Sequence, residues 1–132
     1  MNQTESLHYA IGEIIYAVAS ADGQVQREER SRLKELIEQE HKRHHFDYDL
    51  TDIIFQLLDK QHRKPVESYE WGMNQLRENS HYLSPALKAA AIAMMEKIAE
   101  AFGGVTKEEN ALLLRFRVDI APLVGDPVYY GK

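Results

Sequence analysis

The amino-acid sequence predicts an all-α fold, a single-domain bundle of about six helices built from two related helix–turn–helix units. Three observations lead to this prediction. Apolar residues recur at helical spacing along most of the 132-residue chain. No segment combines sustained alternation with β-branched residues, so no sheet is expected. A segment at 19–29 recurs in altered form at 99–109.

The repeated segment lies between two apolar helical stretches in both copies. Six of the eleven aligned positions are identical. Because the flanking apolar positions also align, we expect one helix–turn–helix unit to occur twice. Two such units can pack around a pseudo-twofold axis, which predicts one domain rather than two. In the first copy the identical residues are Ala19, Ala21, Gly23, Val25, Glu28 and Glu29.

The first two helices flank the first copy of the repeat. A helix is expected over about 4–21, and Gly23 ends it because glycine readily adopts the positive φ common after a helix C-terminus. The second helix, over about 27–45, is charged at most positions and is therefore expected at the surface. The apolar stripe of the first helix comprises Leu7, Ile11, Ile14, Ile15 and Val18, and that of the second comprises Leu33, Leu36 and Ile37.

Two more helices are expected in the middle of the chain. Asp47 or Asp49 can cap a third helix, whose apolar stripe lies within 50–58. The pair Lys64-Pro65 opens a fourth helix, because proline is tolerated in the first turn, where its missing N–H has no helical partner anyway. Its inward face comprises Val66, Tyr69, Met73 and Leu76.

The last two helices flank the second copy of the repeat. Ser84 followed by proline begins a fifth helix that runs to Phe102, and its many alanines make it the expected central helix. Thr106 and Glu109 form a capping box that opens a sixth helix. The helical pattern stops after Val118, so residues 1–118 are expected to form the bundle. The tail, 119–132, contains prolines and glycines and is expected to be an irregular arm.

Composition excludes several classes of function. The chain has no cysteine, which rules out disulfides, thiolate catalysis and cysteine-bound zinc. A net charge of −5 argues against nucleic acid as a partner, since phosphate binding needs a basic surface. No apolar stretch free of charges is long enough to span a membrane. The amino terminus lacks the layout of a signal peptide, so a cytoplasmic location is expected.

The acidic turn of the repeat raises the question of a divalent cation. Asp22, Gly23, Val25 and Glu29 have the spacing of the second half of an EF-hand loop, but the ligand positions of the first half are missing. One interpretation is therefore structural, because acids at a helix start stabilise its positive end. The other is a metal site, whose predicted ligands are Asp22, Glu29 and Glu109, with Glu28, Glu100 and Glu108 as secondary candidates.

Two histidines offer a weaker alternative. His41 and His45 are four residues apart, a spacing that places both imidazoles on one helix face and could seat zinc, although no third ligand is apparent. Basic residues near a helix C-terminus also have a simpler explanation in the helix dipole. No nucleophile elbow or phosphate-binding glycine loop accompanies the polar residues, so the protein is expected not to be an enzyme.

At the repeated turn the chain resembles the TerB-like family, small helical domains associated with tellurite resistance. A related domain occurs in membrane-linked DnaJ-type co-chaperones. The resemblance covers about residues 5–118, and Phe102 departs from it where an aspartate is expected. It rests on Ala19, Ala21, Asp22, Gly23, Val25 and Glu29 in the first copy, and on Ala101, Gly103, Val105 and Glu109 in the second.

The resemblance implies an all-helical bundle without enzymatic activity that works as a cytoplasmic interaction module in stress or membrane-associated complexes. It also implies that the acids beside the turns are metal ligands, with Asp22, Glu29 and Glu109 as the matching positions. We therefore expect a protein-interaction module in a tellurite or stress response. The alternative is a divalent-metal-binding or sensing protein with its site at Asp22–Glu29. A protein partner is expected, and homo-oligomerisation is compatible with the sequence.

Overall fold

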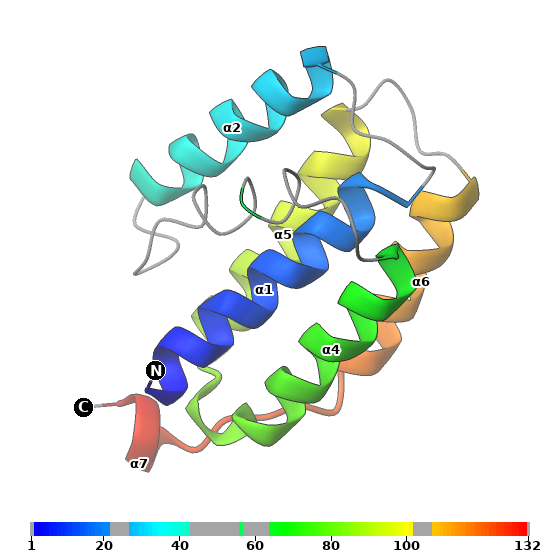
Figure 1. The fold of residues 1–132 in the computed structure, drawn as a ribbon. Coiled ribbons are helices and arrows are strands. Elements are labelled where there is room, and N and C mark those ends of the chain that lie inside the picture. Colours follow the sequence, from blue (N-terminus) through cyan, green and yellow to red (C-terminus); the bar gives the residue numbers. More distant parts are fainter. Residues whose placement is uncertain (1, 22–26, 43–55, 57–63, 102–106, 132) are drawn as a thin grey trace.

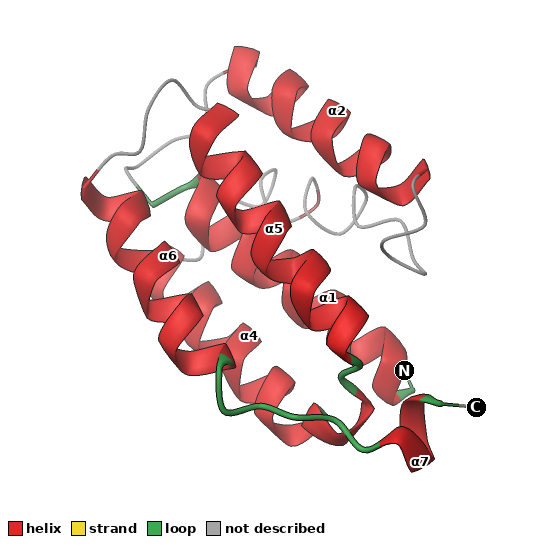
Figure 2. Cartoon of the chain, turned by 180° about the vertical axis from the view of Figure 1, so that it is seen from behind, coloured by secondary structure: helices red, strands yellow, loops and turns green. Residues whose placement is uncertain are grey.

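The structure is a computed structural model that describes residues 2–21, 27–42, 56, 64–101 and 107–131 (Figure 1). This part of the chain is helical and contains no strand, which confirms the predicted all-α bundle (Figure 2). The α-helices are α1 (Gln3–Ala19), α2 (Arg27–Lys42), α4 (Pro65–Glu78), α5 (Pro85–Ala101), α6 (Lys107–Ile120) and α7 (Pro127–Tyr130), and one 3₁₀ helix, η1, spans Ser80–Tyr82.

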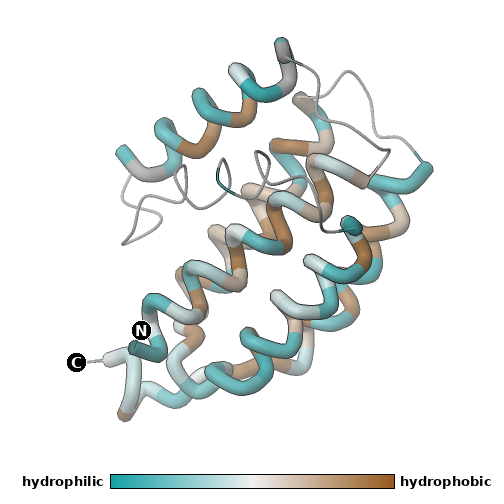
Figure 3. Tube along the Cα trace, viewed as in Figure 1, coloured by the Kyte–Doolittle hydropathy of each residue, from teal (hydrophilic) through white to brown (hydrophobic). Residues whose placement is uncertain are grey.

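The central helix of the bundle is α1, which contacts α4, α5, α6 and η1. Buried residues occupy nearly every position from Leu7 to Ser20. In Figure 1, α1 runs between α2 and α4, and Figure 3 shows that much of its length is hydrophobic. The prediction that the alanine-rich fifth helix would be central was wrong. Ala86, Ala89 and Ala93 of α5 are exposed, because alanine favours helix formation at a surface as well as close packing in a core.

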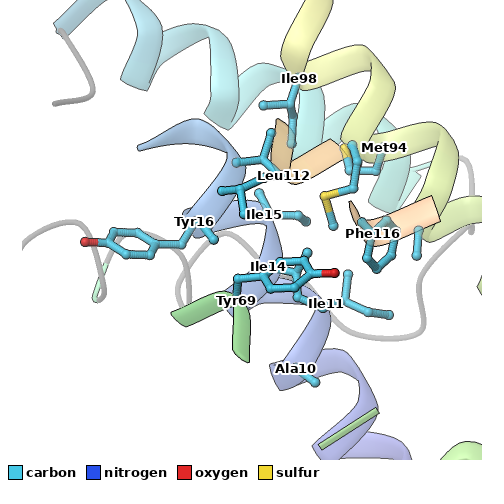
Figure 4. Packing of buried hydrophobic residues seen from close by; sticks show 14 of the residues in the cluster. Ala10, Ile11, Ile14, Ile15, Tyr16, Tyr69, Met94, Ile98, Leu112 and Phe116 are labelled. Atoms are coloured by element: carbon cyan, nitrogen blue, oxygen red, sulfur yellow. The ribbon is translucent and has the colours of Figure 1, made fainter. Parts of the chain in front are cut away.

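The core lies where α1, α4, α5 and α6 converge, and α4 contributes Tyr69, Met73 and Leu76 to it. In Figure 4, Ile11, Ile14 and Ile15 lie close to Phe116 of α6. Each of these side chains is fully buried, and burying an aliphatic or aromatic side chain of this size is worth roughly 1.5–3 kcal/mol. The apolar faces that the sequence predicts for these helices are therefore the faces that stabilise the bundle.

Gly72 sets the distance between α1 and α4. A Cβ atom at this position would lie 2.7 Å from Ile14 Cγ1 and 2.9 Å from the carbonyl oxygen of Ala10. The two helices therefore approach so closely that only glycine fits without displacing α1. Beside this contact, the rings of Tyr9 and Trp71 meet edge to face at 5.4 Å, so Trp71 covers the seam between the two helices.

The helix α2 lies on one side of the bundle against α5 (Figure 1). Its buried positions are Leu33, Ile37 and Glu40, which fall on one face at helical spacing. Most of its other described side chains are exposed or half-buried, as the charged sequence predicts.

The starts of α4 and α5 are where the sequence places them. Pro65 is the first residue of α4, and Pro85 is the first of α5. The hydroxyl of Ser84 accepts a hydrogen bond from the backbone N–H of Leu87 at 3.1 Å, which is the predicted cap. The third predicted helix, within 50–58, and both repeated turns lie outside the described residues apart from Gln56. The predicted pseudo-twofold relation between the two repeat units stays a prediction.

The carboxyl-terminal tail differs from the predicted irregular arm. The helix α6 continues past Val118 to Ile120, which is fully buried because it extends the stripe of Leu112 and Phe116. A short helix, α7, follows, and the side chain of Asp126 caps it by accepting from the N–H of Val128 at 2.9 Å. Asp126 followed by Pro127 is a typical start of a helix. The prediction missed it because it considered only the prolines and glycines of the tail as helix breakers.

Residues 121–131 cross the end of the bundle and contact η1 (Figure 2). The ammonium group of Lys88 donates hydrogen bonds to the carbonyl oxygens of Ala121 and Leu123, both at 2.9 Å. The N–H of Asp126 donates to the carbonyl of His81 at 2.9 Å, and the ring of Tyr129 packs against His81 at 4.7 Å. The tail is thereby joined to the segment between α4 and α5.

Candidate functional site

The predicted acidic site is only partly within the described structure. Asp22 and the side chain of Glu29 lie outside it, although Glu29 itself belongs to the first turn of α2. Glu109 is in the first turn of α6 and is only 1% exposed. A carboxylate at this place is stabilised by the helix dipole, at roughly 0.3–1 kcal/mol for an exposed group and more when partly buried. Metal binding at the turn stays a prediction.

The three secondary acidic candidates are exposed and lie in different surroundings. Glu28 is in the first turn of α2. Glu100 borders a small hollow of about 220 Å³ together with Arg32 and Lys97, whereas Glu108 borders a larger groove on α6. Within the described ranges, no three His, Asp or Glu side chains come close enough together to hold a metal ion.

The histidine alternative also falls outside what the structure describes. His41 belongs to α2, but its side chain is not described, and neither is any part of His45. The predicted zinc spacing therefore stays a prediction.

A partly buried ion pair, which was not predicted from the sequence, joins α2 to α5. The ammonium group of Lys97 donates to Glu40 Oε1, and Glu40 is only 4% exposed. A signal was present in the sequence, because Glu40 continues the spacing of Leu33 and Ile37 on the apolar face of its helix. A charged residue on such a face needs a partner of opposite charge when it is buried.

A polar network joins α4 to α6. The hydroxyl of Tyr69 donates to Asp119 Oδ2 at 2.6 Å, and the guanidinium groups of Arg77 and Arg115 lie 3.8 and 3.6 Å from the same oxygen. The Arg115 guanidinium also lies over the Tyr69 ring, 4.6 Å from its centroid. Asp119 was assigned to the irregular tail from the sequence, yet in the structure it is the acceptor at the centre of this network.

Burial, reinforced by the hydrogen bond to Asp119, raises the pKa of Tyr69 well above its usual value. The phenol therefore keeps its proton at neutral pH and acts as a hydrogen-bond donor. Its contribution to stability is present at neutral pH and is lost as the pH rises above the ordinary tyrosine pKa, because the unfolded chain then releases the proton more readily. The arrangement links α6 to α4 through a hydrogen bond and charge contacts.

An apolar groove lies beside this network, where the start of α4 faces the first half of α6. Its volume is about 550 Å³, within the range of about 300–1,000 Å³ that is usual for binding clefts. Charged groups from three side chains, Lys64, Glu108 and Arg115, border it. We call it the α4–α6 groove, and its lining residues are Ala21, Lys64, Pro65, Val66, Glu108, Ala111, Leu112 and Arg115.

The α4–α6 groove could not be found from the sequence. Val66 was predicted to face inward on α4, but it is 50% exposed and lines the groove. Periodicity shows that a residue belongs to the apolar face of a helix, but it does not show whether neighbouring helices close over that face.

The chain was compared with known protein families. Residues 8–120 match the family described as tellurite resistance protein TerB. The matched segment starts within α1 and ends at the last residue of α6, so residues 121–131 lie beyond it. No curated protein and no solved structure matched the chain. None of the described helices is long and apolar enough to span a membrane.

Proposed function

The chain belongs to the family of tellurite resistance protein TerB, and we propose that it acts as a non-enzymatic protein-interaction module in a cytoplasmic tellurite or stress response. The observation that supports the proposal most is the α4–α6 groove. Its walls are mostly apolar, and its volume of about 550 Å³ suits several side chains of a partner.

The chemistry of the groove fits a protein partner. Val66 offers exposed apolar surface at its α4 wall, and Ala111 leaves space at its α6 wall. An amphipathic segment can bury apolar side chains in such a groove. Lys64, Glu108 and Arg115 at the border can then orient the segment through charge, since rim charges mainly determine specificity and the rate of association.

Replacing Val66 with glutamate tests this proposal. Because the substitution places a charge in the apolar groove, we expect partner binding to weaken by at least about tenfold. In a strain whose tellurite tolerance depends on this chain, we expect survival on tellurite to fall to the level of a deletion. Unchanged circular dichroism and melting temperature should show that the variant is folded, because Val66 is half exposed in the wild type.

The matched control is Val124→Glu, which changes a 77%-exposed valine in the tail, away from the groove. It should retain wild-type tolerance. A photo-crosslinking residue at position 66 should capture a specific protein that the same residue at position 124 does not. Full tellurite tolerance of Val66→Glu, together with equal crosslinking from both positions, would contradict the proposal.

Divalent-metal binding or sensing is the second candidate function. The observation in its favour is Glu109, whose carboxylate is 1% exposed beside the predicted turn. Carboxylate oxygens are the ligands that calcium and magnesium prefer. Of the three predicted ligands, Glu109 is the one whose side-chain burial the structure describes.

Amide NMR spectra during titration with calcium, magnesium or zinc test this second function. We expect saturable shifts confined to residues near 20–30 and 100–110, and we expect Glu109→Gln and Asp22→Ala to remove them. Glu78→Gln, which changes an exposed glutamate at the end of α4 that is not a candidate ligand, serves as the control. Shifts that appear with zinc alone and centre on His41 and His45 would place the metal site at the end of α2 instead. The absence of shifts with all three metals would refute the metal-binding function.

A further inference from the structure

The outer face of α6 carries a stripe of exposed apolar side chains. Ala111, Leu114 and Val118 are all exposed, Leu114 by 49% and Val118 by 72%. They lie opposite the face that packs into the core through Leu113 and Phe116. The helix is therefore apolar on two sides, and the bundle covers only one of them.

The spacing of this stripe is that of a helix–helix seam. The three residues are separated by three and then four positions, the a–d–a pattern of a heptad. Glu108 and Arg115 flank the stripe on one side, and Asn110 and Arg117 flank it on the other. All four flanking residues are exposed.

We propose that α6 pairs in antiparallel orientation with α6 of a second copy of this chain. When Ala111 lies opposite Leu114 of the second copy, the same register brings Glu108 beside Arg115 and Asn110 beside Arg117 along the flanks, and it places Val118 opposite Lys107. A twofold axis produces each of these contacts twice, which is the self-complementarity that a symmetric dimer needs. Antiparallel helix dipoles add to the attraction.

The parallel alternative lacks this complementarity. In a parallel pair, the residues that flank the stripe on one side face the residues that flank it on the other side in the second copy, so that Arg115 faces Asn110. The heptad position that would pair with Glu108 precedes the start of α6, so the second copy's helix would offer it no cation. The distribution of charge along the helix therefore selects the antiparallel arrangement and a second copy as the partner.

Both arginines already make contacts within the chain, Arg115 with α4 and Asp119, and Arg117 with α5. Arg117 Nη2 donates to Glu96 Oε1 at 2.7 Å, and Arg115 lies 3.7 Å from Glu70. A guanidinium group has five N–H donors, so these contacts leave others for the second copy. The seam spans only about two helical turns and is smaller than the interfaces of stable dimers, so we expect a dissociation constant on the order of 0.1 mM.

The proposed dimer does not depend on the proposed function. The stripe lies about a quarter turn around α6 from the α4–α6 groove, because successive helical residues are about 100° apart. Ala111, Glu108 and Arg115 belong to both surfaces, whereas Leu114 and Val118 line no part of the groove and Val66 belongs to the groove alone. Val66→Glu should therefore leave the dimer intact, whereas failure of the dimer leaves the groove proposal standing.

Sedimentation equilibrium of the full chain at concentrations up to about 1 mM tests the dimer. We expect reversible self-association that Leu114→Glu weakens at least about tenfold, because it brings two charges into the seam. Val124→Glu adds the same charge at an exposed apolar site outside α6 and should associate like the wild type. A monomer at every concentration, or self-association that Leu114→Glu leaves unchanged, would overturn the proposal.

Disulfide trapping tests the register, and the absence of cysteine from the chain gives it a clean background. Chains carrying Ala111→Cys are mixed with chains carrying Leu114→Cys and then oxidised. The antiparallel register predicts that mixed disulfides exceed the half expected from random pairing. Random proportions, or an excess of disulfides between identical variants, would overturn it.

Discussion

Replacing Gly72 with leucine is expected to destabilise the bundle by about 3 kcal/mol or more. The physical reason is the contact between α1 and α4, where even a Cβ atom would lie 2.9 Å from the carbonyl oxygen of Ala10. A flexible side chain can move away from such a clash, but a helical carbonyl cannot unless the whole helix shifts. The measurement is urea unfolding followed by circular dichroism.

The direction of this effect is the opposite of what helix propensity predicts. In an exposed helix interior, replacing glycine with a better helix former gains about 1 kcal/mol. Asn74→Leu, at an exposed position of the same helix, is the matched control and should change stability little. Gly72→Ala should lie between the control and Gly72→Leu. If Gly72→Leu unfolds at the same urea concentration as the wild type, the close approach of the two helices is not as described.

Replacing Lys97 with methionine is expected to destabilise the protein by about 2–4 kcal/mol. Removing one partner of a fully buried ion pair typically costs about 3–5 kcal/mol, because the remaining charge stays buried without compensation. Here Glu40 is deeply buried, but the side chain of Lys97 is 37% exposed, so water compensates part of the loss. Thermal unfolding monitored by circular dichroism measures the change.

A double-mutant cycle separates the ion pair from the packing around it. Glu40→Leu combined with Lys97→Met replaces both charges with apolar groups, and we expect most of the lost stability to return. The two single variants should also raise hydrogen exchange mainly in α2, which in the described residues packs against α5. If the double variant loses as much stability as the sum of the single variants, Glu40 and Lys97 do not stabilise α2 as a pair.

The starts of the helices were predicted well wherever they depend on residues within a single helical turn. Pro65 and Pro85 begin their helices as expected, and the hydroxyl of Ser84 makes the predicted cap. These features depend on the geometry of a few consecutive residues. The tail shows the limit of that reasoning, since Asp126 and Pro127 start a short helix within a segment otherwise rich in helix breakers.

The candidate site was less accessible to sequence reasoning. The acidic repeat predicted Glu109 as a candidate ligand. In the structure its carboxylate is buried in the first turn of α6. Asp22 and the side chain of Glu29 lie outside the described residues, so their predicted role as ligands stays a prediction. The α4–α6 groove combines residues from the end of α1, the start of α4 and α6. The spacing of residues within one helix cannot predict a surface of this kind.

The sequence by itself determined that the chain is an all-helical member of a known family, because apolar periodicity and the repeated turn are encoded in short stretches. Only the tertiary structure decided which helix is central, how closely α1 approaches α4 at Gly72, and which charge pairs with Glu40. It also decided which apolar faces remain exposed, such as Leu114 and Val118 on α6. Periodicity identifies the apolar side of a helix, but whether that side is covered depends on how distant segments pack together.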